Sequence, residues 1–130
     1  MRAFTPNPLT QDFRTWIERE RAWGRHAVAA IARQRKLVVA DGSGLERFTV
    51  RMALVELTGS VARWGNGLRE GLAKVDRSEA AAAFAAGPPF PATDPRPADC
   101  DHLREYVETG MSALEDLLAG DRRERTQSAG

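Results

Sequence analysis

Few residues in this chain belong to the types that bind metals or act as nucleophiles. Its 130 residues include one cysteine, Cys100, and two histidines. His102 and Glu105 are three residues apart, so on a helix their side chains would share one face. A metal site needs three or four converging ligands, and the other histidine, His26, lies in a basic segment. A lone cysteine also excludes an intramolecular disulfide. We therefore predict no metal and no other cofactor.

A second candidate for chemistry is the segment from Arg21 to His26, which fits the spacing R-x4-H. This spacing resembles the active-site signature of the helical HEPN ribonuclease superfamily. The resemblance implies that Arg21 and His26 lie one turn apart at a dimer interface and cleave RNA without a metal. Ala22 stands where that family usually has a polar residue, and the motif lies early in the chain rather than late. A HEPN-like ribonuclease is therefore an alternative; the preferred interpretation of His26 is a partly exposed residue on an arginine-rich helix.

The chain has no nucleophile elbow, phosphate-binding loop or dinucleotide-binding glycine motif. Its three tryptophans are the next candidates for a functional role. Core packing is their default role, but tryptophan is also enriched where interfaces concentrate binding energy. The candidates for a partner-binding surface are the tryptophans and two leucines on the same helical stripe: Trp16, Trp23, Trp64, Leu68 and Leu72. An alternative is a small apolar ligand held between the tryptophans.

Arginines concentrate in the first third of the chain, where residues 1–40 carry eight basic and three acidic side chains. Residues 78–120 carry two basic and eight acidic side chains, so the simplest explanation is that these two segments attract each other. An alternative is a nucleic-acid-binding surface, because arginines neutralise phosphates and stack on bases. Its candidate residues are Arg14, Arg21, Arg25, Arg33 and Arg35.

Helices must position these residues, because apolar side chains recur along the chain with helical spacing. The first helix is predicted to begin at Asn7 or Thr10 and to end before Asp41, where a Gly- and Ser-rich break follows. The second helix is predicted over residues 44–76. Its apolar series continues without interruption through three glycines: Gly59, Gly65 and Gly67.

The second helix leaves two alternatives open. Ser43 and Glu46 form a capping box, which favours a helix start. Residues 36–52 are also typical of a β-hairpin, since they flank a turn signal and large apolar residues alternate after it: Phe48, Val50, Met52 and Leu54. The glycines inside the apolar stripe indicate either the close approach of another backbone or a kink near Gly65 and Gly67.

The last third of the chain is predicted to hold a short helix, a connector and a long helix. The short helix covers residues 79–86, and a proline-rich connector covers residues 87–98. Asp99 or Asp101 is predicted to cap the last helix. A glycine, Gly120, is predicted to end it, which leaves residues 121–130 as a charged flexible tail.

The composition is typical of one helical domain. We predict an all-α fold over residues 1–120, a helical bundle of three long helices plus one short helix with a Pro-rich connector. No segment approaches the roughly 20 apolar residues that span a membrane, and the first residues are unlike a signal peptide. We therefore expect no membrane partner and a cytoplasmic location. Arginine outnumbers lysine 17 to 2, which indicates a GC-rich bacterial genome.

The predicted length of the second helix leads to a functional hypothesis. A helix over residues 44–76 would be about 50 Å long, which exceeds the core that a domain of this size offers. Its apolar stripe would then need another helix, from a protein partner or a second copy. We therefore predict a non-catalytic interaction or assembly subunit that forms a homodimer. Nucleic-acid binding and HEPN-like ribonuclease activity are the alternatives.

Overall fold

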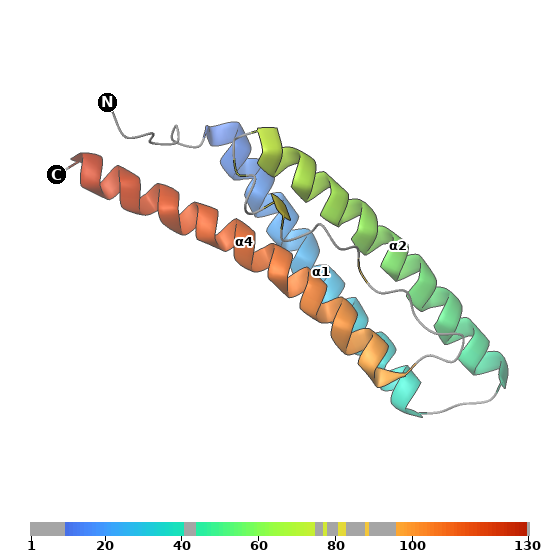
Figure 1. Cartoon of the computed structure of the whole chain (residues 1–130). Coiled ribbons are helices and arrows are strands. Elements are labelled where there is room, and N and C mark those ends of the chain that lie inside the picture. The colour runs from blue at the N-terminus through green and yellow to red at the C-terminus, as the bar shows by residue number, and fades with distance from the viewer. Residues whose placement is uncertain are drawn as a thin grey trace.

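Three long helices form the described part of the chain. The computed structural model describes residues 10–40, 44–74, 77, 81–82, 88 and 96–129, with side chains described as far as residue 120. The helices are α1 (Gln11–Ala40), α2 (Gly44–Lys74) and α4 (Pro97–Ala129). α1 runs antiparallel to both other helices, which are parallel to each other (Figure 1). The all-α prediction is confirmed for this part of the chain, which contains no strand.

The core lies between the three helices. α1 packs most extensively on α4, less on α2, and α2 contacts α4 least. Each helix contributes one apolar stripe to a single cluster: Ile17, Ala27 and Ile31 from α1, Leu54, Val61, Trp64, Leu68 and Leu72 from α2, and Cys100, Leu103, Val107, Leu114 and Leu118 from α4. The helical periodicity of the sequence therefore identified the buried face of each helix.

Local signals account for two of the helix starts. The Thr10 side-chain oxygen accepts a hydrogen bond of 3.1 Å from the backbone N–H of Phe13, so Thr10 is the predicted N-cap of α1. At α4, the Asp99 carboxylate accepts a bond of 2.8 Å from the backbone N–H of Arg96. α4 thus begins at Pro97, and Asp99 lies in its first turn rather than at the cap. Asn7 and the Ser43 capping box lie outside the described residues.

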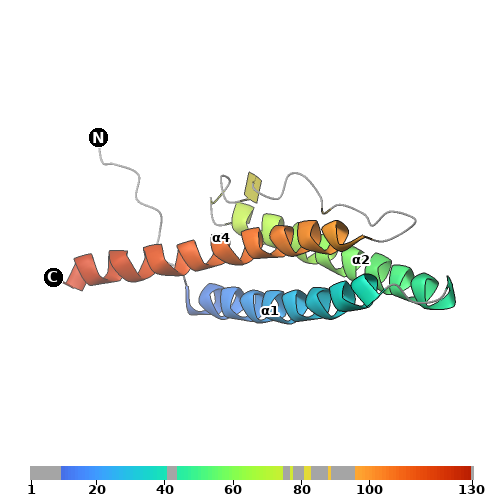
Figure 2. The ribbon, with the colours of Figure 1, turned by 90° about the horizontal axis from the view of Figure 1, so that it is seen from below.

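The end predicted for the last helix is wrong. α4 continues through Gly120 to Ala129. One interior glycine costs a helix only about 1 kcal/mol relative to alanine, and the arginines, glutamate and glutamine that follow favour helix. As a result, the carboxyl end of α4 extends beyond α1 and α2 (Figures 1 and 2). The predicted short helix lies outside the described residues except for helical Ala81 and Ala82, and the connector lies outside them apart from Pro88, Arg96 and the first residues of α4.

The hairpin alternative is wrong because residues 44–74 form one continuous helix. Residues two apart on a helix point in directions about 200° apart, so an apolar residue at every second position makes two opposite apolar stripes. Val50 and Leu54 lie on the core side of α2, whereas Phe48 and Met52 lie on the opposite side and are exposed. The alternation that resembled a strand therefore comes from a helix that is apolar on two faces.

The glycines of the apolar stripes make room for large side chains rather than for another backbone. A Cβ atom built on Gly71 would lie 2.6 Å from the Trp16 ring. A Cβ on Gly24 would lie 2.7 Å from the Met111 side chain, and a Cβ on Gly65 would overlap the Tyr106 hydroxyl. Gly67, in contrast, has open space at its Cβ position. No other described backbone approaches these glycines, and α2 is one continuous helix. Aromatic and methionine side chains occupy the space that the glycines leave.

Among the described helices, none combines the length and the apolar character needed to cross a lipid bilayer.

Candidate interaction surface

The face shared by α1 and α2 is incompletely filled. It holds two cavities of about 450 and 430 Å³, both lined by side chains of α1 and α2 and by none of α4. Ser60 and Arg63 line both cavities, so the two are neighbours along the groove between α1 and α2. We call this surface the α1/α2 face. Its exposed or partly exposed lining residues include Trp16, Glu20, Trp23, Arg33, Glu56, Ser60, Arg63 and Gly67.

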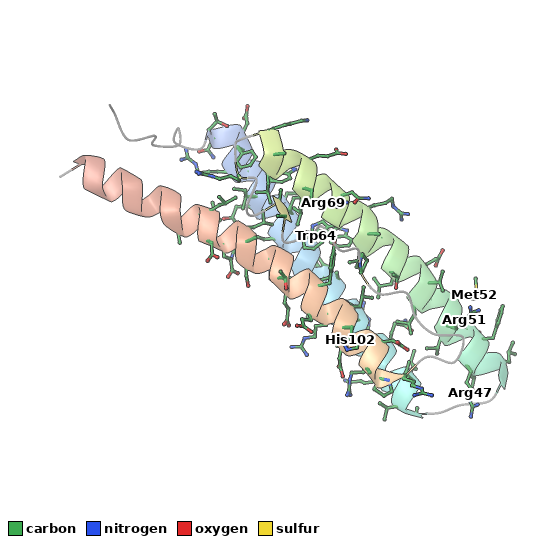
Figure 3. The ribbon with its side chains drawn as sticks, in the orientation of Figure 1. Arg47, Arg51, Met52, Trp64, Arg69 and His102 are labelled. Atoms are coloured by element: carbon green, nitrogen blue, oxygen red, sulfur yellow. The ribbon has the colours of Figure 1, made fainter. Side chains whose placement is uncertain are left out.

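The tryptophans lie at one end of this face. Trp23 of α1 stacks on Trp64 of α2, with ring centroids 5.3 Å apart and an interplanar angle of 25°. Trp16 stacks on Phe13 with centroids 5.0 Å apart and packs against Gly71. Trp64 points from α2 toward the core (Figure 3). Its indole Nε1 is buried and has no hydrogen-bond partner among the residues that the structure describes. The tryptophans therefore join α1 to α2 and also line the larger cavity.

The residues predicted to bind a partner divide into two groups. Leu68 and Leu72 are fully buried in the core of the chain, and Trp64 is only 7% exposed. Trp16 and Trp23 are partly exposed and line the cavity of 450 Å³. The carboxyl half of the α2 stripe is thus covered by its own chain, which leaves the two α1 tryptophans as the members that can reach a partner.

The structure adds an apolar surface that sequence reasoning missed. Among the described residues, five large hydrophobic side chains are exposed: Leu37 by 52%, Val39 by 57%, Leu45 by 76%, Phe48 by 58% and Met52 by 45%. They lie at the end of α1 and the start of α2, where the first turns of α2 project beyond the other two helices (Figures 1 and 2). Met52 points away from α4 (Figure 3). The period-two alternation of apolar residues was the sequence signal that could have identified this surface.

The predicted nucleic-acid-binding arginines are not equivalent in the structure. Arg21 forms an ion pair of 3.1 Å with Glu115 of α4 and contacts Glu18. Arg35 forms an ion pair of 2.9 Å with Asp101 of α4. Arg14 donates a hydrogen bond to Gln11, while Arg25 and Arg33 are exposed. The pairs between α1 and α4 agree with the simplest explanation of the charge layout, the attraction of a basic first segment to an acidic last one.

Arg21 and His26 are not brought together within the chain. Five residues on a helix leave side chains about 140° apart in direction. Arg21 is held by Glu18 and Glu115, and His26 is exposed on the surface of α1. The single chain therefore does not assemble the pair that the ribonuclease resemblance implies.

The other chemical candidates lie on α4. Cys100 is fully buried, and burial raises the pKa of its thiol, with Asp99 and Asp101 adding to the rise and Arg35 opposing it. The group therefore stays a neutral thiol near neutral pH. His102 and Glu105 are exposed on α4. The described residues contain no cluster of three histidine, cysteine, aspartate or glutamate side chains that could hold a metal ion.

The chain was compared with protein families, curated proteins and solved structures. No protein family, curated protein or solved structure matches this chain. The function proposed below therefore depends on the geometry of the chain itself.

Proposed function

We propose that this protein is a non-catalytic helical assembly subunit that associates with a second copy of itself. The observation that carries the proposal is the combination of an unfilled α1/α2 face with large exposed apolar side chains at its end. Leu45 is 76% exposed and Phe48 58% exposed, and the neighbouring face holds cavities of about 450 and 430 Å³. Large exposed apolar patches are uncommon on monomers and mark interaction sites.

The size of the α1/α2 face supports the same proposal. α1 has 30 residues and α2 has 31, so each is about 45 Å long. Two such helices, each about 10 Å wide and with axes about 9 Å apart, present a face about 19 Å wide and so of roughly 900 Å². A stable interface needs about 800 Å² from each partner. The face is therefore large enough for a specific dimer.

Sedimentation equilibrium of the full chain over a wide concentration range tests the proposal. We expect a particle of twice the chain mass of 14.3 kDa that dissociates on dilution. A folded protein that stays at the mass of one chain at every concentration would contradict it. Far-UV circular dichroism on the same samples establishes that the chain is folded.

A further inference from the structure

Charges on the α1/α2 face are arranged about a common centre. Trp23 stacks on Trp64, so these two residues lie at the same level of the bundle. Because α1 and α2 are antiparallel, Ala27, four residues after Trp23, lies level with Ser60, four residues before Trp64. The contact of Trp16 with Gly71 gives the same register. Ala27 and Ser60 also lie within two residues of the midpoints of their helices.

Opposite charges lie at nearly equal distances on either side of this centre. On α1, Glu20 precedes Ala27 by seven residues and Arg33 follows it by six. On α2, Glu56 precedes Ser60 by four residues and Arg63 follows it by three. All four side chains line the groove. When the face is turned end over end, the negative residue of each helix therefore comes to the level that the positive residue occupied, and the positive residue to the level of the negative one.

We infer that two copies pack through their α1/α2 faces about a twofold axis at the level of Ala27 and Ser60. Each helix then lies antiparallel to its counterpart in the second copy, and the helices overlap over nearly their full length. This inference rests on the self-association proposed above and adds its geometry. Because a twofold interface joins one patch to itself, the patch must be complementary to its own rotated copy.

The ionic contacts of this dimer follow from the register. Arg63 meets Glu56 of the second copy with a mismatch of one residue, about 1.5 Å, and the two residues point within about 20° of each other around α2. Glu20 and Arg33 reach the same level, but they point about 140° apart around α1. The twofold axis repeats the contact between Arg63 and Glu56. Glu56 forms no ion pair with another described residue of its own chain, so the dimer supplies a partner for this charge.

Exposed apolar side chains and cavity walls match under the same rotation. Leu37 falls at the level of Trp16 of the second copy, and Met52 falls at the level of Gly67. Trp16 and Gly67 both line the larger cavity, and no described atom outside the adjoining residues of α2 lies within 4 Å of the Cβ position of Gly67. Leu37 and Met52 thus come level with walls of the larger cavity of the other copy. A twofold axis parallel to the helices would instead place the larger cavity over its own copy, whereas the antiparallel dimer places it over the smaller cavity of the second copy.

Charge exchange between residues 56 and 63 tests this geometry. In Glu56→Arg, residue 56 meets Arg63 of the second copy, and in Arg63→Glu two glutamates meet. We expect the dimer dissociation constant of each variant to rise about tenfold or more, because like charges then face each other at two places. The double variant Glu56→Arg/Arg63→Glu restores opposite charges and should recover wild-type affinity. An equimolar mixture of the two single variants should form a heterodimer.

The matched control is Glu105→Arg, which makes the same charge change at an exposed site on α4, outside the face. We expect its dissociation constant to equal that of the wild type. The parallel-axis dimer predicts the opposite result for the double variant. In that dimer the arginine introduced at position 56 would meet Arg33, and the glutamate introduced at position 63 would meet Glu20. Failure of the double variant to recover affinity would therefore overturn the antiparallel geometry.

A second pair of variants tests the cavity. Gly67→Leu places a side chain at the level of Met52 of the second copy, and its own chain leaves room for it. Gly120→Leu is the control, because Gly120 also has open space and lies on α4. We expect weaker association by about tenfold only in Gly67→Leu. Equal affinities for the two would overturn the apolar contact.

These outcomes separate the geometry from the proposed function. A wild-type chain that is monomeric at all concentrations would refute self-association itself. A wild-type dimer that is unaffected by Glu56→Arg and Arg63→Glu would leave self-association standing and refute the α1/α2 face as the interface.

Discussion

The two halves of α2 have similar apolar patterns but opposite surroundings. From Val61 to Leu72, the stripe is buried against α1 and α4. From Leu45 to Met52, large apolar side chains lie on the side of α2 away from the core and face solvent. The comparison shows that an apolar helical stripe identifies a surface that favours contact, whereas burial depends on whether neighbouring helices cover that side. Four predictions test this difference.

The largest effect is expected from truncating one side chain in each half of α2. Leu68→Ala removes a fully buried side chain and should lower the free energy of unfolding by about 3 kcal/mol. Phe48→Ala removes a larger side chain that is 58% exposed and should lower it by less than about 1 kcal/mol. Urea unfolding of both variants at one protein concentration measures the difference. Equal losses would mean that the two halves are equally covered.

A smaller effect is expected from two glycines of α2. Gly65→Ala introduces a Cβ into the space of the Tyr106 hydroxyl and should lower the free energy of unfolding by about 1–2 kcal/mol. Gly59→Ala meets only the Arg63 side chain, at 3.7 Å, and should raise it by about 0.5–1 kcal/mol through helix propensity. Thermal unfolding distinguishes the two. Stabilisation by both substitutions would show that Tyr106 moves aside without cost.

Amide hydrogen exchange should show different exchange rates in the two halves of α2 without any substitution in its buried stripe. In the association-deficient Glu56→Arg variant, amides of residues 61–72 should exchange near the rate set by global unfolding. Amides of residues 48–52 should exchange at least about tenfold faster, because the start of α2 opens locally. The wild-type protein is the comparison. Uniform protection along α2 in the variant would contradict the exposed position of its first turns.

The smallest effect concerns the contact between α1 and α4 near the start of α4. Cys100 is buried there, and burial raises the pKa of its thiol above 9.0. The unfolded chain therefore loses this proton first as pH rises, so the free energy of unfolding should fall above pH about 9 and level off beyond the folded-state pKa. Cys100→Ala should show a shallower fall. Identical slopes of stability against pH in both proteins would indicate that the thiol is hydrated.

Much of the fold could be predicted because its causes are local. The Thr10 cap depends on a hydrogen bond to a residue three positions away. The uninterrupted apolar spacing predicted a helix over most of α2 but left open whether it is continuous through Gly65 and Gly67, as the structure shows it to be. The predicted end at Gly120 was wrong because a glycine permits a helix end without requiring one. No local signal at Gly120 indicates whether the chain beyond it stays helical.

The candidate site was predicted less well, because exposure is a property of three helices together. Leu68 and Leu72 were assigned to a partner, yet they are buried in the core. Phe48 and Met52 were noticed only as support for a hairpin, yet they form part of the exposed surface. Arg21 and Arg35 were candidates for nucleic acid, yet both pair with carboxylates of α4.

The sequence by itself determined that the described chain is helical, which face of each helix is apolar, and that its basic and acidic ends attract. Helix propensity, caps and periodicity act over three or four residues, so the chain carries them without reference to its fold. Only the tertiary structure decided which apolar residues are covered and which charges share one face. That outcome depends on the register of Trp23 on Trp64 and on which side of α2 its neighbours cover, which are contacts between residues distant in the chain.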